Sequence, residues 1–112
     1  MSLHEKYRIS SKAAFSHVLD KPDVRFKVGP YFLLGKKNNC FYPRLGVTIK
    51  KRENKLAVQR NYLKRKIKNS FNEVVDKLPS LDYVIMVQKN IKGPNYKEDL
   101  LLLWERCLKE GG

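Results

Sequence analysis

Five polar residues between positions 60 and 68 have the types and the spacing to hold a chain of phosphates. Arg60, Asn61, Lys64, Arg65 and Lys68 would cover one arc of roughly 140° on a helix. Arginine holds phosphate through two parallel hydrogen bonds, whereas lysine acts as a mobile point charge. Because a helix rises by about 1.5 Å per residue, this arc would reach successive phosphates. The pattern predicts that the segment binds a polyanion.

An apolar stripe accompanies the basic arc along the same segment. Its residues follow the helical period and are Leu63, Ile67, Phe71 and Val74. A stripe of this kind packs on a core and leaves the arc facing a partner. We therefore expect one long amphipathic helix, capped by Asn54 and ending at about Asp76.

The net charge of the chain is concentrated around this helix. The 112 residues carry a net charge of +13, and nine basic residues and one acid lie between Lys50 and Lys68. This short stretch thus holds eight of the thirteen net charges, with Lys50 and Lys51 at its start. Such a patch favours nucleic acid as the partner, because neutralising phosphates releases counterions. A merely solvated basic helix face is the alternative.

Other classes of protein fit the composition less well. No apolar run approaches the roughly 18 residues that span a bilayer, and no signal-peptide pattern opens the chain. We expect a cytoplasmic protein with one domain over residues 1–112, in which Cys40 and Cys107 are reduced thiols. A single disulfide is the alternative. His4 and His17 have no metal-ligand spacing with either cysteine.

The hydrophobic pattern predicts seven elements in the order α-β-β-β-α-β-α. In chain order they are a helix from Ser10 or Ser11 to Leu19, strands at Val24–Val28, at Tyr31–Leu34 (ended by Gly35) and at Arg44–Lys50, the long helix, a strand at Tyr83–Val87, and a helix opened by a capping box at Asn95–Glu98. The near-continuous apolar run at Tyr83–Val87 indicates an interior strand. Two helices on a four-stranded sheet, with the small first helix, make an α+β two-layer sandwich.

These residues together resemble one protein family. The pattern Arg60-Asn61-x-x-Lys64-Arg65-x-x-Lys68 resembles the Arg-Asn signature of the bacterial ribonuclease P protein component, with Lys68 where arginine is usual. Further segments resemble that family in the same order, namely Tyr7–Phe15, Arg44–Lys51, Leu81–Ile85 and Trp104–Cys107.

The resemblance implies a specific role. Family members act as a subunit beside a large catalytic RNA, which removes the 5′ leader of precursor tRNA by Mg²⁺-assisted hydrolysis. The basic helix would pack on that RNA, and a cleft between the first helix and the sheet would receive the leader. The Mg²⁺ would be held mainly by the RNA and the substrate, and not by the protein alone. The resemblance also implies a monomer in the holoenzyme and a left-handed crossover from the third strand to the fourth, against the usual right-handed rule.

Aromatic side chains are the natural contacts for a single-stranded leader, because every base has a face that can stack. Phe15, Phe32 and Tyr31 are the candidates for this cleft. Phenylalanine at such spacing is as often a core residue, and that alternative stays open.

The sequence offers no catalytic residue or metal site of its own. The acids are scattered, and we find neither a nucleophile elbow nor a glycine-rich phosphate loop. Two other classes of function remain. One is a ribosomal or ribosome-assembly protein, and the other is a DNA-binding regulator that uses residues 60–68 as a recognition helix.

Overall fold

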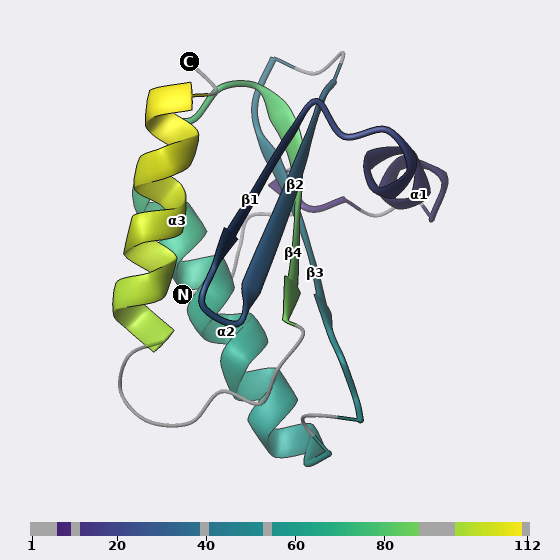
Figure 1. Ribbon diagram of the computed structural model, residues 1–112, viewed down its shortest axis with the longest axis vertical. Coiled ribbons are helices and arrows are strands. Elements are labelled where there is room, and N and C mark those ends of the chain that lie inside the picture. The colour runs from purple at the N-terminus through teal and green to yellow at the C-terminus, as the bar shows by residue number, and fades with distance from the viewer. Residues whose placement is uncertain (1–6, 10–11, 39–40, 53–54, 88–95, 111–112) are drawn as a thin grey trace.

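The computed structural model describes residues 7–9, 12–38, 41–52, 55–87 and 96–110, and it confirms the expected order of elements (Figure 1). The helices are α1 (Lys12–Asp20), α2 (Ala57–Val74) and α3 (Tyr96–Glu110). The strands are β1 (Val24–Val28), β2 (Tyr31–Lys37), β3 (Arg44–Ile49) and β4 (Leu81–Val87).

The four strands form one mixed sheet in the order β1-β2-β4-β3. Strand β2 is antiparallel to both β1 and β4, and β3 is parallel to β4. The interior place predicted for β4 is therefore confirmed, and five consecutive residues, Leu81 to Ile85, are buried. Helix α2 connects the parallel pair β3 and β4, which is the crossover to which the family resemblance assigns a left-handed course.

Two local predictions were wrong. Gly35 does not end β2 but lies inside the sheet, where it pairs with Val24 and Tyr83. A Cβ at Gly35 would lie 2.6 Å from Val24 Cγ2, so glycine is needed there for packing and not for a turn. The N-cap of α2 is Leu56, which is extended and makes no side-chain cap hydrogen bond. The predicted cap, Asn54, lies outside the described residues, as does Asn95 before α3.

The helices cover the two faces of the sheet unequally. Helices α2 and α3 lie together on one face, and α1 lies on the other (Figure 1). Because side chains alternate along a strand, the two central strands β2 and β4 supply both layers. The larger core holds Leu33, Tyr83 and Ile85 against α2 and α3, and the smaller one holds Leu34 and Val84 against α1.

An aromatic cluster locks α2 and α3 together over the sheet. The ring of Phe71 lies 5.5 Å from that of Trp104 and 6.4 Å from that of Tyr83, in edge-on contacts. Trp104 Nε1 donates a hydrogen bond of 2.9 Å to Ser70 Oγ, which in turn donates one of 2.8 Å to Ile67 O. These two hydrogen bonds give the buried indole N–H of Trp104 a partner. They also fix how α2 is rotated about its axis.

The substitution Phe71→Ala should lower the free energy of unfolding by about 3–5 kcal/mol, because Phe71 is fully buried and its removal leaves a cavity. Urea denaturation followed by circular dichroism measures this loss. The matched control is Leu102→Ala on α3, where the side chain is 50% exposed and the expected change is within about 0.5 kcal/mol. A loss below about 1 kcal/mol for Phe71→Ala would contradict this packing.

Candidate nucleic-acid interface

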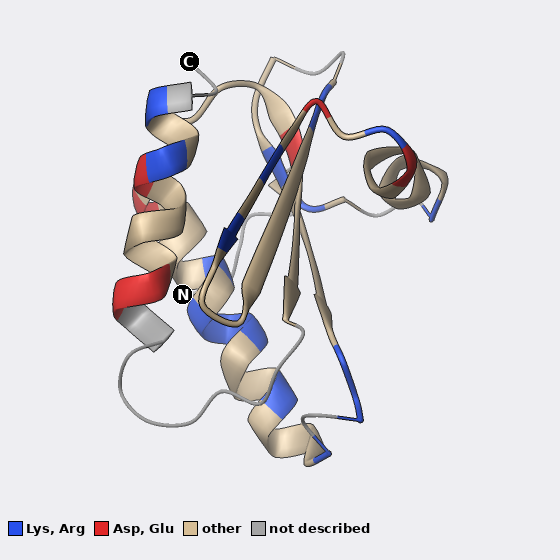
Figure 2. Cartoon of the chain, in the orientation of Figure 1, with Lys and Arg blue, Asp and Glu red and all other residues tan. Residues whose placement is uncertain are grey.

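The basic arc of α2 lies where the amphipathic pattern predicts. Leu63, Ile67 and Phe71 are buried, so the residues of the arc, which lie on another side of the helix, are outside the core. Asn61 and Arg65 are exposed, while the side chains of Arg60, Lys64 and Lys68 are half-buried. Figure 2 shows the resulting bands of positive charge along α2. The helix holds five basic residues and a single acid, Glu73.

Arg60 differs from the rest of the arc because its guanidinium also supports the loop before α2. Its Nη1 donates a 2.8 Å hydrogen bond to the carbonyl oxygen of Lys55, five residues earlier. Its backbone amide donates to Leu56 O at 3.1 Å, which opens the helix. Arg60 therefore shapes the entry to the helix as well as adding charge.

Arg8, near the start of the chain, adds a cation to the basic arc. Arg8 forms a parallel bridge with Leu45 of β3, and the amide of Ile9 donates a hydrogen bond to Leu45 O at 3.1 Å. Partial burial, followed by the positive charges of Arg8 and Lys64, lowers the pKa of Lys68. Arg8, Lys64 and Lys68 thus form a cluster of like charges that an anion would relieve. Sequence reasoning missed Arg8, because its place depends on a tertiary contact.

Lys50 and Lys51 follow β3, and the structure separates Lys50 from the arc. Lys50 comes two residues after Thr48, so both side chains belong to the sheet face that carries α1. Its amide donates to Val87 O at 3.0 Å, which holds the residue at the end of the sheet. Lys51 is exposed in the turn that follows. Of the seven predicted RNA-binding residues, Lys50 therefore belongs to a different surface.

That second surface is a row of side chains across the sheet. Lys27 pairs with Phe32, Phe32 with Met86, and Met86 with Thr48, so one residue from each strand contributes. Phe32 and Met86 are half-buried and pack beside the small core under α1. The row thus offers an aromatic ring and a thioether with a cation at its β1 end.

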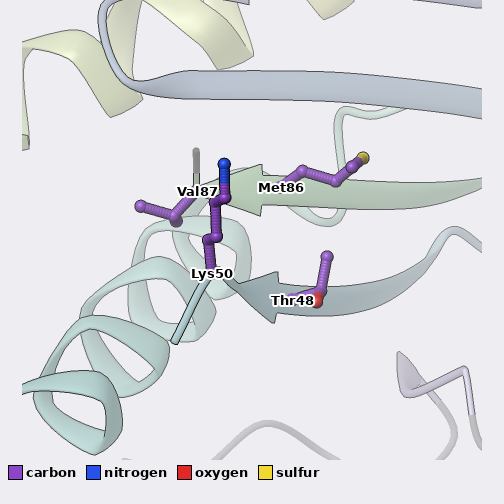
Figure 3. Close-up of a pocket in the computed structure, with 4 residues that line it drawn as sticks. All are labelled: Thr48, Lys50, Met86 and Val87. Carbon is purple, nitrogen blue, oxygen red and sulfur yellow. The ribbon is translucent and has the colours of Figure 1, made fainter. Parts of the chain in front are cut away.

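A pocket of about 300 Å³ extends the row at the ends of β3 and β4 (Figure 3). Its lining residues are Thr48, Lys50, Met86 and Val87. Figure 3 shows the long side chain of Lys50 next to Val87, with Met86 and Thr48 on its other side. Lys50 therefore adds a second cation to this surface, at the opposite side from Lys27.

Phe15 of α1 reaches the same sheet face. Its ring lies against Gly46 of β3, where an added Cβ would come within 2.8 Å of Phe15 Cε2. Phe15 is half-buried and, like Phe32, packs against the smaller core. The structure thus brings together two of the three aromatic residues that we predicted for a leader cleft.

Tyr31, the third of these residues, does not lie in the cleft, and this prediction is wrong. Its side chain is 0% exposed and belongs to the larger core under α2 and α3. The alternation of side chains along β2 places Tyr31 and Phe32 on opposite faces of the sheet. A neighbouring pair of aromatic residues in a strand cannot serve the same surface.

The buried acid Asp82 has a structural explanation. Both of its carboxylate oxygens accept hydrogen bonds from Arg44, at 2.7 and 2.6 Å, and Oδ1 also accepts one from Asn38 at 2.8 Å. This bidentate pair ties β4 to β3. Among the described residues, no three His, Cys, Asp or Glu side chains gather in a group that fits a metal ion.

Comparisons with known proteins agree on one family. A family model described as Ribonuclease P matches residues 3–110. The ribonuclease P protein component of Pseudomonas aeruginosa is 35% identical over 105 residues, which cover 91% of this chain and 78% of that protein. The corresponding protein of Alcanivorax borkumensis is 29% identical, with coverage of 92% and 88%.

Solved structures show the same fold. The RNase P protein of Staphylococcus aureus superposes with a TM-score of 0.74 at 22% identity, covering 94% of each chain. The RNase P protein from Thermotoga maritima gives a TM-score of 0.74 at 24% identity, covering 88% of this chain and 96% of that one.

The place of Phe15 on the second surface can be tested through its contact with Gly46. Gly46→Ala should destabilise the protein by about 1–3 kcal/mol, because the new methyl group overlaps the ring. In a Phe15→Ala background the same change should be neutral or stabilising. Thermal unfolding of the four proteins in this double-mutant cycle measures the coupling. Equal effects of Gly46→Ala in the two backgrounds would show that Phe15 does not lie on Gly46.

Proposed function

Since this chain belongs to the ribonuclease P protein family, we propose that it binds the catalytic RNA subunit and the 5′ leader of precursor tRNA, and so assists removal of that leader. The observation that carries this proposal is the basic arc of α2, which lies outside the core beside the buried apolar stripe of the same helix. A helix of this kind on a folded domain suits a large, structured polyanion.

The RNA subunit would contact α2 through Asn61, Lys64, Arg65 and Lys68, with Arg60 at the helix entry and Arg8 beside Lys68. Arg65 is exposed and can grip one phosphate through two hydrogen bonds. Phosphate beside Lys68 would favour its charged form and so reverse the effects that lower its pKa. Lys51, exposed after β3, would add to the same contact.

The leader would lie on the opposite face of the sheet, along the row from Lys27 to Thr48. Phe15 and Phe32 can stack on bases, and Lys27 and Lys50 can pair with phosphates at the two sides. Contacts of this kind depend little on base identity, which suits a subunit that must accept the leaders of many precursors.

We further propose that the RNA subunit carries out the hydrolysis, with Mg²⁺ held mainly by the RNA and the substrate. The donors in the described part of the chain do not fit a metal site, and the buried carboxylate of Asp82 is already held by Arg44 and Asn38. The protein would then supply positioning and charge, as one copy in each holoenzyme.

We also propose that the holoenzyme acts in the cytoplasm, where precursor tRNA would be found in a bacterial cell. No described helix has both the length and the apolar character to cross a membrane. Cys107 is a reduced thiol buried in the core, which suits a reducing compartment. The ribosomal alternative is not favoured, because the relatives compared above are ribonuclease P proteins.

Reconstitution tests the proposal. The catalytic RNA alone is expected to cleave precursor tRNA poorly at low Mg²⁺, and this protein should restore cleavage there, because its cations reduce the repulsion between two RNAs. The protein without the RNA should produce no mature 5′ end. If the folded protein does not stimulate cleavage by the RNA at low Mg²⁺, this result would contradict the proposal and favour a ribosomal role.

Lys68→Met should have opposite effects on stability and on RNA binding. The free protein should be at least as stable as the wild type, because the charged ammonium is disfavoured by burial and by Arg8 and Lys64. Affinity for the catalytic RNA should fall, and the slope of log K against log[salt] should shrink by about 0.7–0.9. Thermal melts and filter binding at several salt concentrations measure both effects.

The matched control for this test is Lys77→Met, which removes an exposed lysine beyond the end of α2. It should leave the salt slope nearly unchanged. If Lys68→Met and Lys77→Met bind RNA equally well, then the arc on α2 is only a solvated face.

A further inference from the structure

The first turns of α2 carry an exposed apolar surface that the basic arc does not explain. Leu56 is 68% exposed, Val58 81% and Tyr62 43%. Val58 and Tyr62 are four residues apart, so they lie one above the other on the helix. With Leu63 and Ile67 buried against the sheet, this strip faces away from the core. We call Val58 and Tyr62 the outer strip, and Leu56 is the exposed N-cap residue before it.

Cations border the outer strip. Lys66 Nζ lies 5.2 Å from the centroid of the Tyr62 ring, and Arg65, three residues after Tyr62, is exposed. Lys55, just before Leu56, is exposed as well. The surface thus combines a flat aromatic group with positive charge. A second copy of this chain fits it poorly, because that copy would bring its own net charge of +13.

A nucleobase fits this surface, because it offers a flat apolar face together with a phosphate. Stacking of a base on an aromatic ring is stronger than the contact of an exposed lysine with that ring. A base can therefore displace the ammonium of Lys66, which is then available for the phosphate of the same nucleotide. The exchange keeps the cation paired and gains the stacking contact.

We propose that Tyr62 is a base-stacking residue and receives an unpaired nucleobase of the catalytic RNA, an inference that rests on the function proposed above. The base must be unpaired, because a base inside a duplex has no free face. It belongs to the RNA subunit and not to the leader, because α2 lies on the sheet face opposite to the row of Phe32 and Met86. The outer strip thus adds a stacking contact to an interface in which the basic arc binds phosphates.

Substitution of Tyr62 separates stacking from charge. Tyr62→Leu keeps an apolar side chain and a good helix former but removes the ring. Its affinity for the catalytic RNA should fall roughly 5- to 150-fold, which corresponds to the loss of about 1–3 kcal/mol for one stacked base. The slope of log K against log[salt] should not change, because no phosphate contact is lost. Tyr62→Phe should bind within about threefold of the wild type, since it keeps the ring.

The control is Leu102→Ala, which removes a 50% exposed apolar side chain from α3 and should leave RNA affinity within about twofold. Wild-type affinity for Tyr62→Leu, or a loss equally large for Tyr62→Phe, would overturn the inference. So would a wild-type dimer in sedimentation that becomes monomeric in Tyr62→Leu without any change in RNA affinity. Absence of RNA binding by the wild type would instead count against the proposed function itself.

Discussion

The burial of one narrow stripe of α2 is the constraint on which both surfaces of this protein depend. Burying the side chains of Leu63, Ile67 and Phe71 contributes about 1.5–3 kcal/mol each. A rotation of α2 by one residue would move Lys64 and Lys68 toward the core, at a desolvation cost of several kcal/mol per ion. The hydrogen bonds from Trp104 through Ser70 to Ile67 O oppose such a rotation as well. The packing of the core therefore decides which side chains of the helix meet a partner.

The same packing separates the two surfaces. Because α2 and α3 cover one face of the sheet, the other face carries α1 and the half-buried row of Phe32 and Met86. The alternation of side chains along β2 gives Tyr31 to the core and Phe32 to the open face. A single sheet can thus hold a structured RNA on the side of α2 and a single strand on the side of α1, without competition between them.

Periodic features of the sequence predicted most of the fold. The stripe of α2, the apolar run of β4 and the alternation in β3 each record which side of an element is buried, so their places follow from local pattern. Two features have no local signal. Gly35 was mistaken for a strand end because the need for space beside Val24 exists only after β1 and β2 pair. Leu56 caps α2 by backbone conformation alone, which no residue preference announces.

The residues of the candidate site likewise divide into those that local pattern predicts and those that depend on tertiary contacts. Helical spacing predicted Asn61, Lys64, Arg65 and Lys68 together, but it could not reveal Arg8. A bridge to β3 places Arg8 where its charge acts on Lys68. The concentration of charge between Lys50 and Lys68 also grouped Lys50 with the arc, whereas strand alternation assigns Lys50 to the opposite face.

Directed cleavage from single cysteines tests the separation of the two surfaces most directly. An iron chelate that generates hydroxyl radicals would be attached at Arg65→Cys on α2 or at Thr48→Cys on β3, with Cys40 replaced by serine. Cys107 is buried and would not react. In the complete holoenzyme with precursor tRNA, position 65 should cut the catalytic RNA and position 48 should cut the leader. Cleavage of the same RNA segment from both positions would contradict the account.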